Sequence, residues 1–136
     1  MDEPRDALNM NQGQVVGQVS KKIEFAYLLL EAEEARGVAD HDDWDGGSCS
    51  PHLSAGSLAI AVRVPMEGEV NLKVLRGAHG KDLLPLVVFS GKIDSSSGEF
   101  VVSDPLDTFS INFSSSGIFE VRVDEYQAAE VQIIVL

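Results

Sequence analysis

Cysteine and basic side chains are scarce in this chain of 136 residues. The single cysteine, Cys49, excludes an intramolecular disulfide framework. Ten lysine and arginine residues stand against 22 aspartate and glutamate residues, which gives a formal net charge of −12. This excess of negative charge works against direct binding to DNA, RNA or an anionic membrane surface. It favours a cationic or metal-rich partner.

A signal peptide is also absent from the first twenty residues, which carry acids and amides where a basic and then an apolar stretch would be needed. We therefore expect a cytoplasmic protein. Apolar residues make up 44% of the chain, which is ordinary for a globular protein, and the length suits one domain. We expect residues 1–21 to be a flexible or loosely attached segment and residues 22–136 to form a single β-sandwich domain.

Alternating apolar residues predict short β-strands along most of the chain. Residues 58–64 and 70–74 alternate on either side of a Pro-Met-Glu-Gly stretch, which is the pattern of a hairpin. Residues 22–32 are ambiguous, because their aromatic and β-branched members favour a strand while their leucines and Glu-Ala tract favour a helix. We favour a strand there. Further strands are expected at residues 86–93, 99–103, 109–113, 119–123 and 131–136.

Seven or eight such strands, with turn residues between them and little helix, indicate an all-β protein. The expected architecture is an antiparallel β-sandwich or a jelly-roll-like pair of sheets. The almost wholly apolar residues 131–136 suit a strand inside a sheet. The pattern leaves the strand order and the oligomeric state open.

Acidic residues are densest between residues 31 and 45, where Arg36 is the only lysine or arginine. A basic partner would relieve the repulsion between these carboxylates. The attraction between the two proteins would be long-range, and salt would weaken it. The alternative is a solvated loop that keeps the protein soluble. The residues expected to contact a partner are Glu31, Glu33, Glu34, Asp40, Asp42, Asp43, Trp44 and Asp45.

Trp44 is the only tryptophan and lies among these carboxylates. A large aromatic side chain in this position serves either as a contact anchor for a partner or as a pin that holds the loop on the sandwich. We favour the pin.

Two metal sites in the same region fail the spacing test. An EF-hand loop that began at Asp40 would need glycine at position 45 and glutamate at position 51, where the chain has Asp45 and Pro51. His41, Cys49 and His52 are residue types that bind zinc, but their spacing fits no established ligand pattern. We assign no metal and no cofactor, and a less regular calcium site in the acidic loop is kept as an alternative.

No arrangement of residues indicates catalysis. Cys49 and either His52 or His79 are the residue types of a nucleophile and a base, yet no strand-to-helix nucleophile elbow surrounds Cys49. The glycines at 77, 80 and 91 form no phosphate-binding loop. We therefore expect a protein that is not an enzyme.

The order of several features resembles the competence protein J family. They are a strand-like KIEFAYLLLEA segment, an acidic loop with Trp44 and Asp45 at its centre, Gly56 before an apolar strand, Phe89 in a strand after Pro85, and the Gly-Ile-Phe triplet at 117–119. The resemblance covers residues 22–136. It implies a small bacterial β-sandwich that binds and inhibits a DNA-degrading nuclease of the DNA-uptake machinery, and it assigns no individual inhibitory residue.

Charge and resemblance together predict a non-enzymatic, acidic protein-binding module. Its expected partner is a basic protein, either a nuclease or a toxin, because a compact acidic protein can present carboxylates where a nuclease binds phosphates. An immunity protein for a toxin fits the same charge argument. The alternative is a β-sandwich that binds a carbohydrate or another small ligand, with calcium in the acidic loop.

Overall fold

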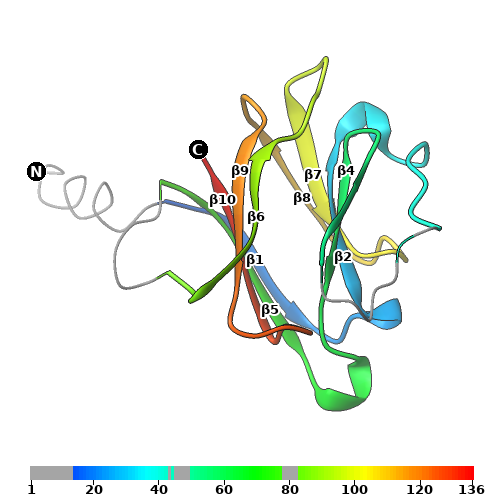
Figure 1. Cartoon of the computed structure of the whole chain (residues 1–136), viewed down its shortest axis with the longest axis vertical. Coiled ribbons are helices and arrows are strands. Elements are labelled where there is room, and N and C mark those ends of the chain that lie inside the picture. Colours follow the sequence, from blue (N-terminus) through cyan, green and yellow to red (C-terminus); the bar gives the residue numbers. More distant parts are fainter. Residues whose placement is uncertain (1–13, 43, 45–49, 78–82) are drawn as a thin grey trace, which may run out of the picture.

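The computed structural model describes residues 14–42, 44, 50–77 and 83–136. Ten strands in this part of the chain form two five-stranded sheets that face each other (Figure 1). One sheet has the order β1 (Gln14–Lys21), β5 (Val70–Arg76), β10 (Glu130–Val135), β9 (Ile118–Val123) and β6 (Leu86–Lys92). The other has the order β3 (His52–Ser54), β4 (Ser57–Ala61), β2 (Tyr27–Ala32), β7 (Glu99–Ser103) and β8 (Ser110–Ser114).

The predicted all-β class with little helix is confirmed. The helices of the described chain are single 3₁₀ turns, η1 (Glu24–Ala26), η2 (Glu33–Ala35) and η4 (Pro65–Glu67). The strand number is larger than expected, since the sequence pattern does not predict β1 and β3. One pairing also differs from the antiparallel expectation: β10 runs parallel to β5, with Val131 opposite Leu72.

The core between the sheets is built from alternate residues of the strands. Phe100 of β7 and Phe113 of β8 come from one sheet and Phe119 of β9 from the other, and the ring centroids of Phe100 and Phe119 are 5.0 Å apart. Phe113 also packs against Phe119, with centroids 6.0 Å apart. These three rings pack the two sheets together, near one end of β7, β8 and β9.

The predicted hairpin is wrong. β4 and β5 belong to different sheets, and the chain crosses between them through η4 and Gly68, whose φ is +126°. Val62 makes an isolated bridge with Ala128 on the way. Alternation shows which face of a strand is buried but not which strand it pairs with, so a crossing and a hairpin have the same sequence pattern.

The N-terminal boundary also differs from the prediction. Gln14–Lys21, expected within a loosely attached segment, forms edge strand β1 and pairs antiparallel with β5 from Gln14–Arg76 to Lys21–Val70. Gly17 lies so close to Ile111 of β8 that a Cβ would be 2.7 Å from a side-chain carbon of Ile111. An edge strand carries many polar residues, so the alternation of apolar and polar residues that predicts a strand is weak in its sequence.

The ambiguous residues 22–32 form a strand over their second half only. β2 begins at Tyr27, after a turn in which Phe25 and Ala26 have left-handed φ values of 65° and 57°. Ile23 is 1% exposed and packs into the core ahead of this turn. The strand interpretation therefore holds for residues 27–32, while residues 23–26 turn the chain into the sheet.

Removal of residues 131–136 tests the expected interior position of the last strand. β10 pairs with both β5 and β9, and Val131, Ile133 and Ile134 are at most 1% exposed. We expect the truncated protein to be insoluble, because two strands lose their partner and apolar surface becomes exposed.

The measurement is the soluble fraction after expression, followed by urea unfolding of whatever stays in solution. Removal of Leu136 alone, whose side chain is 60% exposed, is the control and should leave a folded protein. A soluble six-residue truncation that unfolds cooperatively would show that β10 is peripheral.

Candidate functional site

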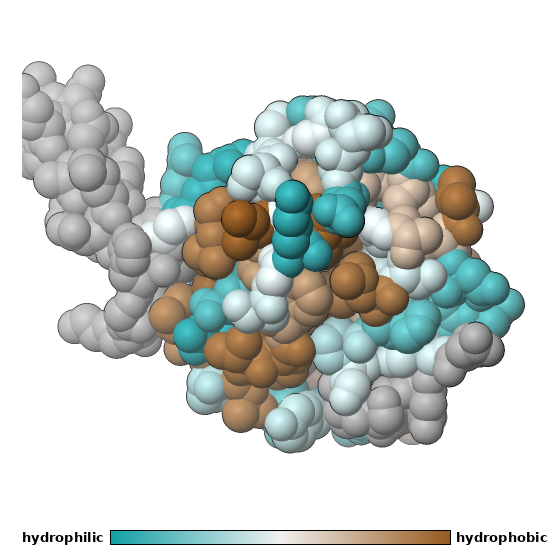
Figure 2. All heavy atoms as spheres, turned by 45° about the horizontal axis from the view of Figure 1, so that its top comes forward, coloured by the Kyte–Doolittle hydropathy of each residue, from teal (hydrophilic) through white to brown (hydrophobic). Residues whose placement is uncertain are grey.

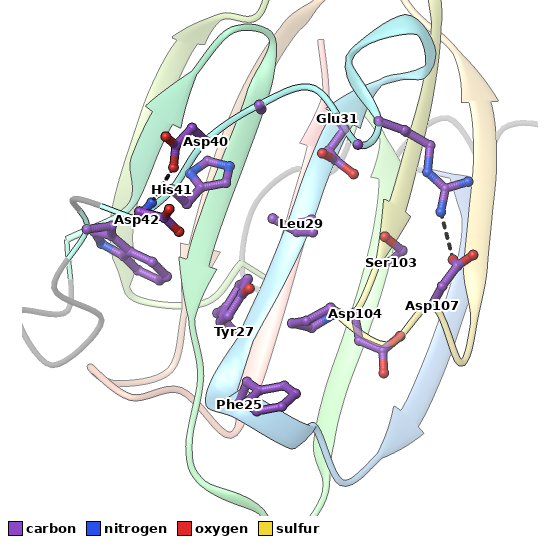
Figure 3. Close-up of a pocket in the computed structure, with 15 residues that line it drawn as sticks. Phe25, Tyr27, Leu29, Glu31, Asp40, His41, Asp42, Ser103, Asp104 and Asp107 are labelled. Atoms are coloured by element: carbon purple, nitrogen blue, oxygen red, sulfur yellow. Dashed lines mark hydrogen bonds and ion pairs between the residues drawn. The ribbon is translucent and has the colours of Figure 1, made fainter.

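A groove of about 820 Å³ crosses the outer face of the sheet that contains β2 (Figure 3). The floor is the outward face of β2 with the turn before it, and consists of Phe25, Tyr27, Leu29 and Glu31. Alternation along β2 produces this floor, because Leu28 and Leu30 point inward and are 0% exposed. A single strand thus supplies core on one side and groove on the other.

One wall of the groove belongs to the predicted acidic segment. Asp40, His41, Asp42 and Trp44 lie along it, in the chain that leaves η2 (Figure 3). The Oδ1 atom of Asp40 accepts a hydrogen bond from the backbone N–H of Asp42 at 2.8 Å, which holds the turn between them. Asp43 and Asp45, which belong to the same predicted segment, lie outside the described residues.

The opposite wall comes from the turn between β7 and β8, which the sequence analysis did not select. Asp104 and Asp107 line it, together with Ser103 and Pro105. Asp104 is 3% exposed and accepts hydrogen bonds from both the N–H and the hydroxyl of Thr108, so it holds the turn. Asp107 points into the groove from a left-handed φ of 54°. In the sequence, the Asp-Pro pair at 104–105 indicates only a break between two strands.

Charge in the groove is mostly negative. Five carboxylates line it against one guanidinium, that of Arg36, whose Nη2 lies 2.7 Å from Oδ1 of Asp107. The carboxylates belong to Glu31, Asp40, Asp42, Asp104 and Asp107. The groove therefore unites acids from two distant parts of the chain.

Glu31 is the acidic residue of the groove floor. Its residue is 5% exposed, and its Oε2 atom accepts a hydrogen bond from Ser57 at 2.8 Å. Burial raises the pKa of Glu31 above its usual value, while the Ser57 hydrogen bond and the nearby Arg36 charge lower it in part. A cation beside this carboxylate would favour its ionised form.

A histidine pair extends the Glu31–Ser57 contact. Nδ1 of His41 lies 2.8 Å from Nδ1 of His52, and Nε2 of His41 lies 2.9 Å from the Ser57 hydroxyl. With Glu31 ionised, Ser57 donates to it, so His41 donates through Nε2 and accepts a hydrogen bond from His52 at Nδ1. This chain of hydrogen bonds requires neutral His41, and it fastens the acidic segment to β3 and β4.

This network has no nucleophile that a substrate can reach. Ser57 is 0% exposed, so its hydroxyl, which donates to Glu31, is out of reach of a substrate. Cys49 and His79, the other candidates, lie outside the described residues. Among the residues that the structure describes, no three His, Cys, Asp or Glu side chains gather closely enough to hold a metal ion.

Trp44 packs against the sheet beside the groove. Its ring meets the Tyr27 ring edge-on at a centroid distance of 5.5 Å and stacks on His52 at 6.5 Å. The indole N–H donates to the backbone oxygen of Ser50 at 2.7 Å. These contacts are those of a residue that pins the acidic segment.

Glu34 and Glu33 do not line the groove. Glu34 accepts hydrogen bonds from the serine turn between β6 and β7, including one of 2.8 Å from the Ser97 hydroxyl. Its own backbone N–H, the Ser97 hydroxyl and the Ser96 N–H lower the pKa of Glu34 to about 2. Glu33 is exposed on η2. Partner contact through these two residues stays a prediction.

On the face shown in Figure 2, apolar residues gather in several separate patches between polar ones. Exposed apolar residues are similarly scattered along the described chain, with exposed fractions from 44% for Ile118 to 95% for Met66. Scattered apolar residues are normal on protein surfaces, so they do not mark a second interface. In the described part of the chain, no helix is long and apolar enough to cross a membrane.

Comparison with known proteins identifies a structural relative. No protein-family model matches the chain, and no curated protein matches it. ComJ from Bacillus subtilis, an inhibitor of the DNA-degrading activity of NucA, is similar in structure, with a TM-score of 0.64. The match covers 91% of this chain and 97% of ComJ at 8% sequence identity. The resemblance to the competence protein J family is therefore confirmed at the level of the fold.

Substitution Glu34→Gln should lower the melting temperature at neutral pH, because the serine turn loses an ionised acceptor. The folded-state pKa of Glu34, about 2, is below its ordinary value of 4.5, so the stabilisation is complete above pH 4.5 and is lost toward pH 2. The stabilities of the two proteins should therefore converge in acid. Urea unfolding at about pH 6 and about pH 3.5 measures this. Glu33→Gln, the exposed neighbour, is the control, and an equal effect of both substitutions would contradict a role specific to Glu34.

The histidine pair should make the protein less stable in mild acid. Burial, and then the neighbouring His52, lower the pKa of His41 below its ordinary value of 6.5. The unfolded chain then takes up the proton first, so stability falls as the pH drops through 6.5. We expect His41→Gln to reduce the loss of unfolding free energy between about pH 7.5 and about pH 5.5. An unchanged loss would show that His41 titrates as in the unfolded chain.

Proposed function

We propose that this chain is a non-enzymatic inhibitor of a basic protein, namely a DNA-degrading nuclease. The observation that carries the proposal is the groove over β2, where five carboxylates face one guanidinium. A nuclease must attract phosphates, so the surface around its active site is basic. A protein that presents several carboxylates on a fixed frame can occupy such a surface and exclude DNA from it.

The likeness to ComJ supports the same function. ComJ is an inhibitor of the DNA-degrading activity of NucA, and it shares the arrangement of strands with this chain. The net charge of −12 agrees with a basic partner, because opposite charges speed association and salt screens them. A toxin nuclease with its immunity protein belongs to the same class of complex.

The proposed interface combines the acidic segment with the β7–β8 turn. Asp40, Asp42 and Asp107 are exposed at its rim, while Glu31 lies at its floor. Glu33, Glu34, Asp43, Trp44 and Asp45 are proposed as further contacts of the same segment. Rim charges contribute mainly to the rate of association, and buried charges contribute mainly to the lifetime of the complex.

The partner can be captured from host lysate on an N-terminally tagged protein, at about 50 mM and about 300 mM salt. Mass spectrometry then identifies the retained protein, and its digestion of DNA is measured with and without this chain. We expect a basic nuclease that is retained at low salt, depleted at high salt, and inhibited. A retained protein with no nuclease activity, or a nuclease whose activity does not change, would contradict the proposal.

The double variant Asp40→Asn and Asp42→Asn tests the acidic wall. An asparagine side chain at position 40 can still accept the hydrogen bond from the backbone of residue 42, so the turn is kept while two charges are removed. We expect inhibition to weaken about five- to thirtyfold with a nearly unchanged melting temperature.

The matched control is Glu67→Gln with Glu69→Gln, which removes two exposed charges outside the groove. If this control weakens inhibition as much as the Asp40 and Asp42 variant, net charge rather than the groove determines binding.

A further inference from the structure

We propose that the groove over β2 binds an arginine side chain of the partner, with its guanidinium over Tyr27 and between Glu31 and Asp42 (Figure 3). The inference rests on the proposed function, which supplies a basic protein as the source of the arginine. A groove of about 820 Å³ is large enough for one long side chain with part of its backbone.

Glu31 provides a carboxylate with unused hydrogen-bonding capacity at the floor of the groove. Among the described residues, Ser57 alone donates a hydrogen bond to it, whereas a carboxylate can accept about four. Its residue is 5% exposed, and no buried side-chain oxygen of the described residues lacks a hydrogen-bond partner, so the second carboxylate oxygen of Glu31 opens into the groove. A cation that enters the groove would compensate for the desolvation of this carboxylate. A fully hydrated surface carboxylate needs no such compensation.

Tyr27 provides an aromatic surface on the same face of β2 as Glu31, with Leu29 between the two residues. It is four residues earlier on the outward face of β2, and the Trp44 ring packs edge-on against it and holds it in place. Burial, and then the charges of Asp42 and Glu31, raise the pKa of the Tyr27 hydroxyl. Both carboxylates therefore act on the same ring, and a cation over that ring interacts with the ring and both charges.

Arg36 shows that the groove accommodates a guanidinium. Its side chain is 36% exposed and pairs with Asp107 at one end of the groove. The floor on the other side of Glu31 includes Leu29, Tyr27 and Phe25, whose surfaces are largely apolar. A guanidinium is planar and weakly hydrated, so it stacks on such surfaces and forms paired hydrogen bonds with carboxylates. A lysine ammonium ion holds its water more strongly and lacks the planar shape.

Titration of the isotope-labelled full chain with N-acetyl-arginine amide, followed by NMR, tests the site without any nuclease. We expect saturable shifts of the backbone amides of Tyr27, Leu29 and Glu31. N-acetyl-lysine amide should bind at least about threefold more weakly, and the uncharged N-acetyl-citrulline amide should cause no saturable shift. Equal binding of lysine, or arginine shifts spread evenly over the acidic surface, would overturn the proposal.

Three variants separate the ring from the charge. Tyr27→Leu and Glu31→Gln should each weaken arginine binding about fivefold or more, while Tyr27→Phe should retain most of it. Glutamine at position 31 can still accept the Ser57 hydrogen bond and needs no charge in a buried position, so this variant is expected to fold. Glu67→Gln is the control for lost charge, and an equal loss of binding in it would overturn the site.

The same variants in the inhibition assay distinguish this inference from the proposed function. If arginine binds in the groove but no nuclease is inhibited, the site is right and the inhibitor function is wrong. If a nuclease is inhibited equally by the wild-type, Tyr27→Leu and Glu31→Gln proteins, the function is right and the arginine site is wrong.

Discussion

The two-sided strand β2 is the constraint on which the rest of the structure depends. Leu28 and Leu30 must be buried, and their burial orients Tyr27, Leu29 and Glu31 to the other side of the sheet. Because β2 lies between β4 and β7, its outward face is flanked by chain on both sides and becomes the floor of a groove. A shift of one residue in its pairing would bury Glu31 in the core and expose the leucines.

The groove concentrates charge at a place where it is partly removed from water. Asp40 and Asp42 belong to the segment after η2, and Asp107 belongs to the turn between β7 and β8, which is distant in sequence. The histidine pair and Ser57 link the acidic segment to the sheet beneath it. The carboxylates are therefore held on a frame, which reduces the entropy that a partner must remove when it binds.

Sequence reasoning reached the fold class and most strands because alternation with a period of two survives wherever one face is buried. It missed β1, an edge strand with polar exposed positions, and it joined β4 to β5 because alternation carries no information about partners. It selected Glu31, Asp40 and Asp42, which line the groove, because a dense run of acidic residues can be seen in the sequence alone. Asp104 and Asp107 could not be predicted from the sequence, because only the pairing of β2 with β7 brings them to the same groove as Glu31.

The parallel pairing of β5 with β10 has a consequence for synthesis on the ribosome. All strands of the sheet that contains β2 have emerged once Ser114 has left the tunnel, whereas the other sheet lacks its middle strand until residues 130–135 appear. Until then β5 and β9 have no partner between them, and the inner faces of both sheets are incompletely covered. The nascent chain thus passes through a stage in which a half-built sandwich exposes apolar strands, and contact with other chains at this stage favours aggregation.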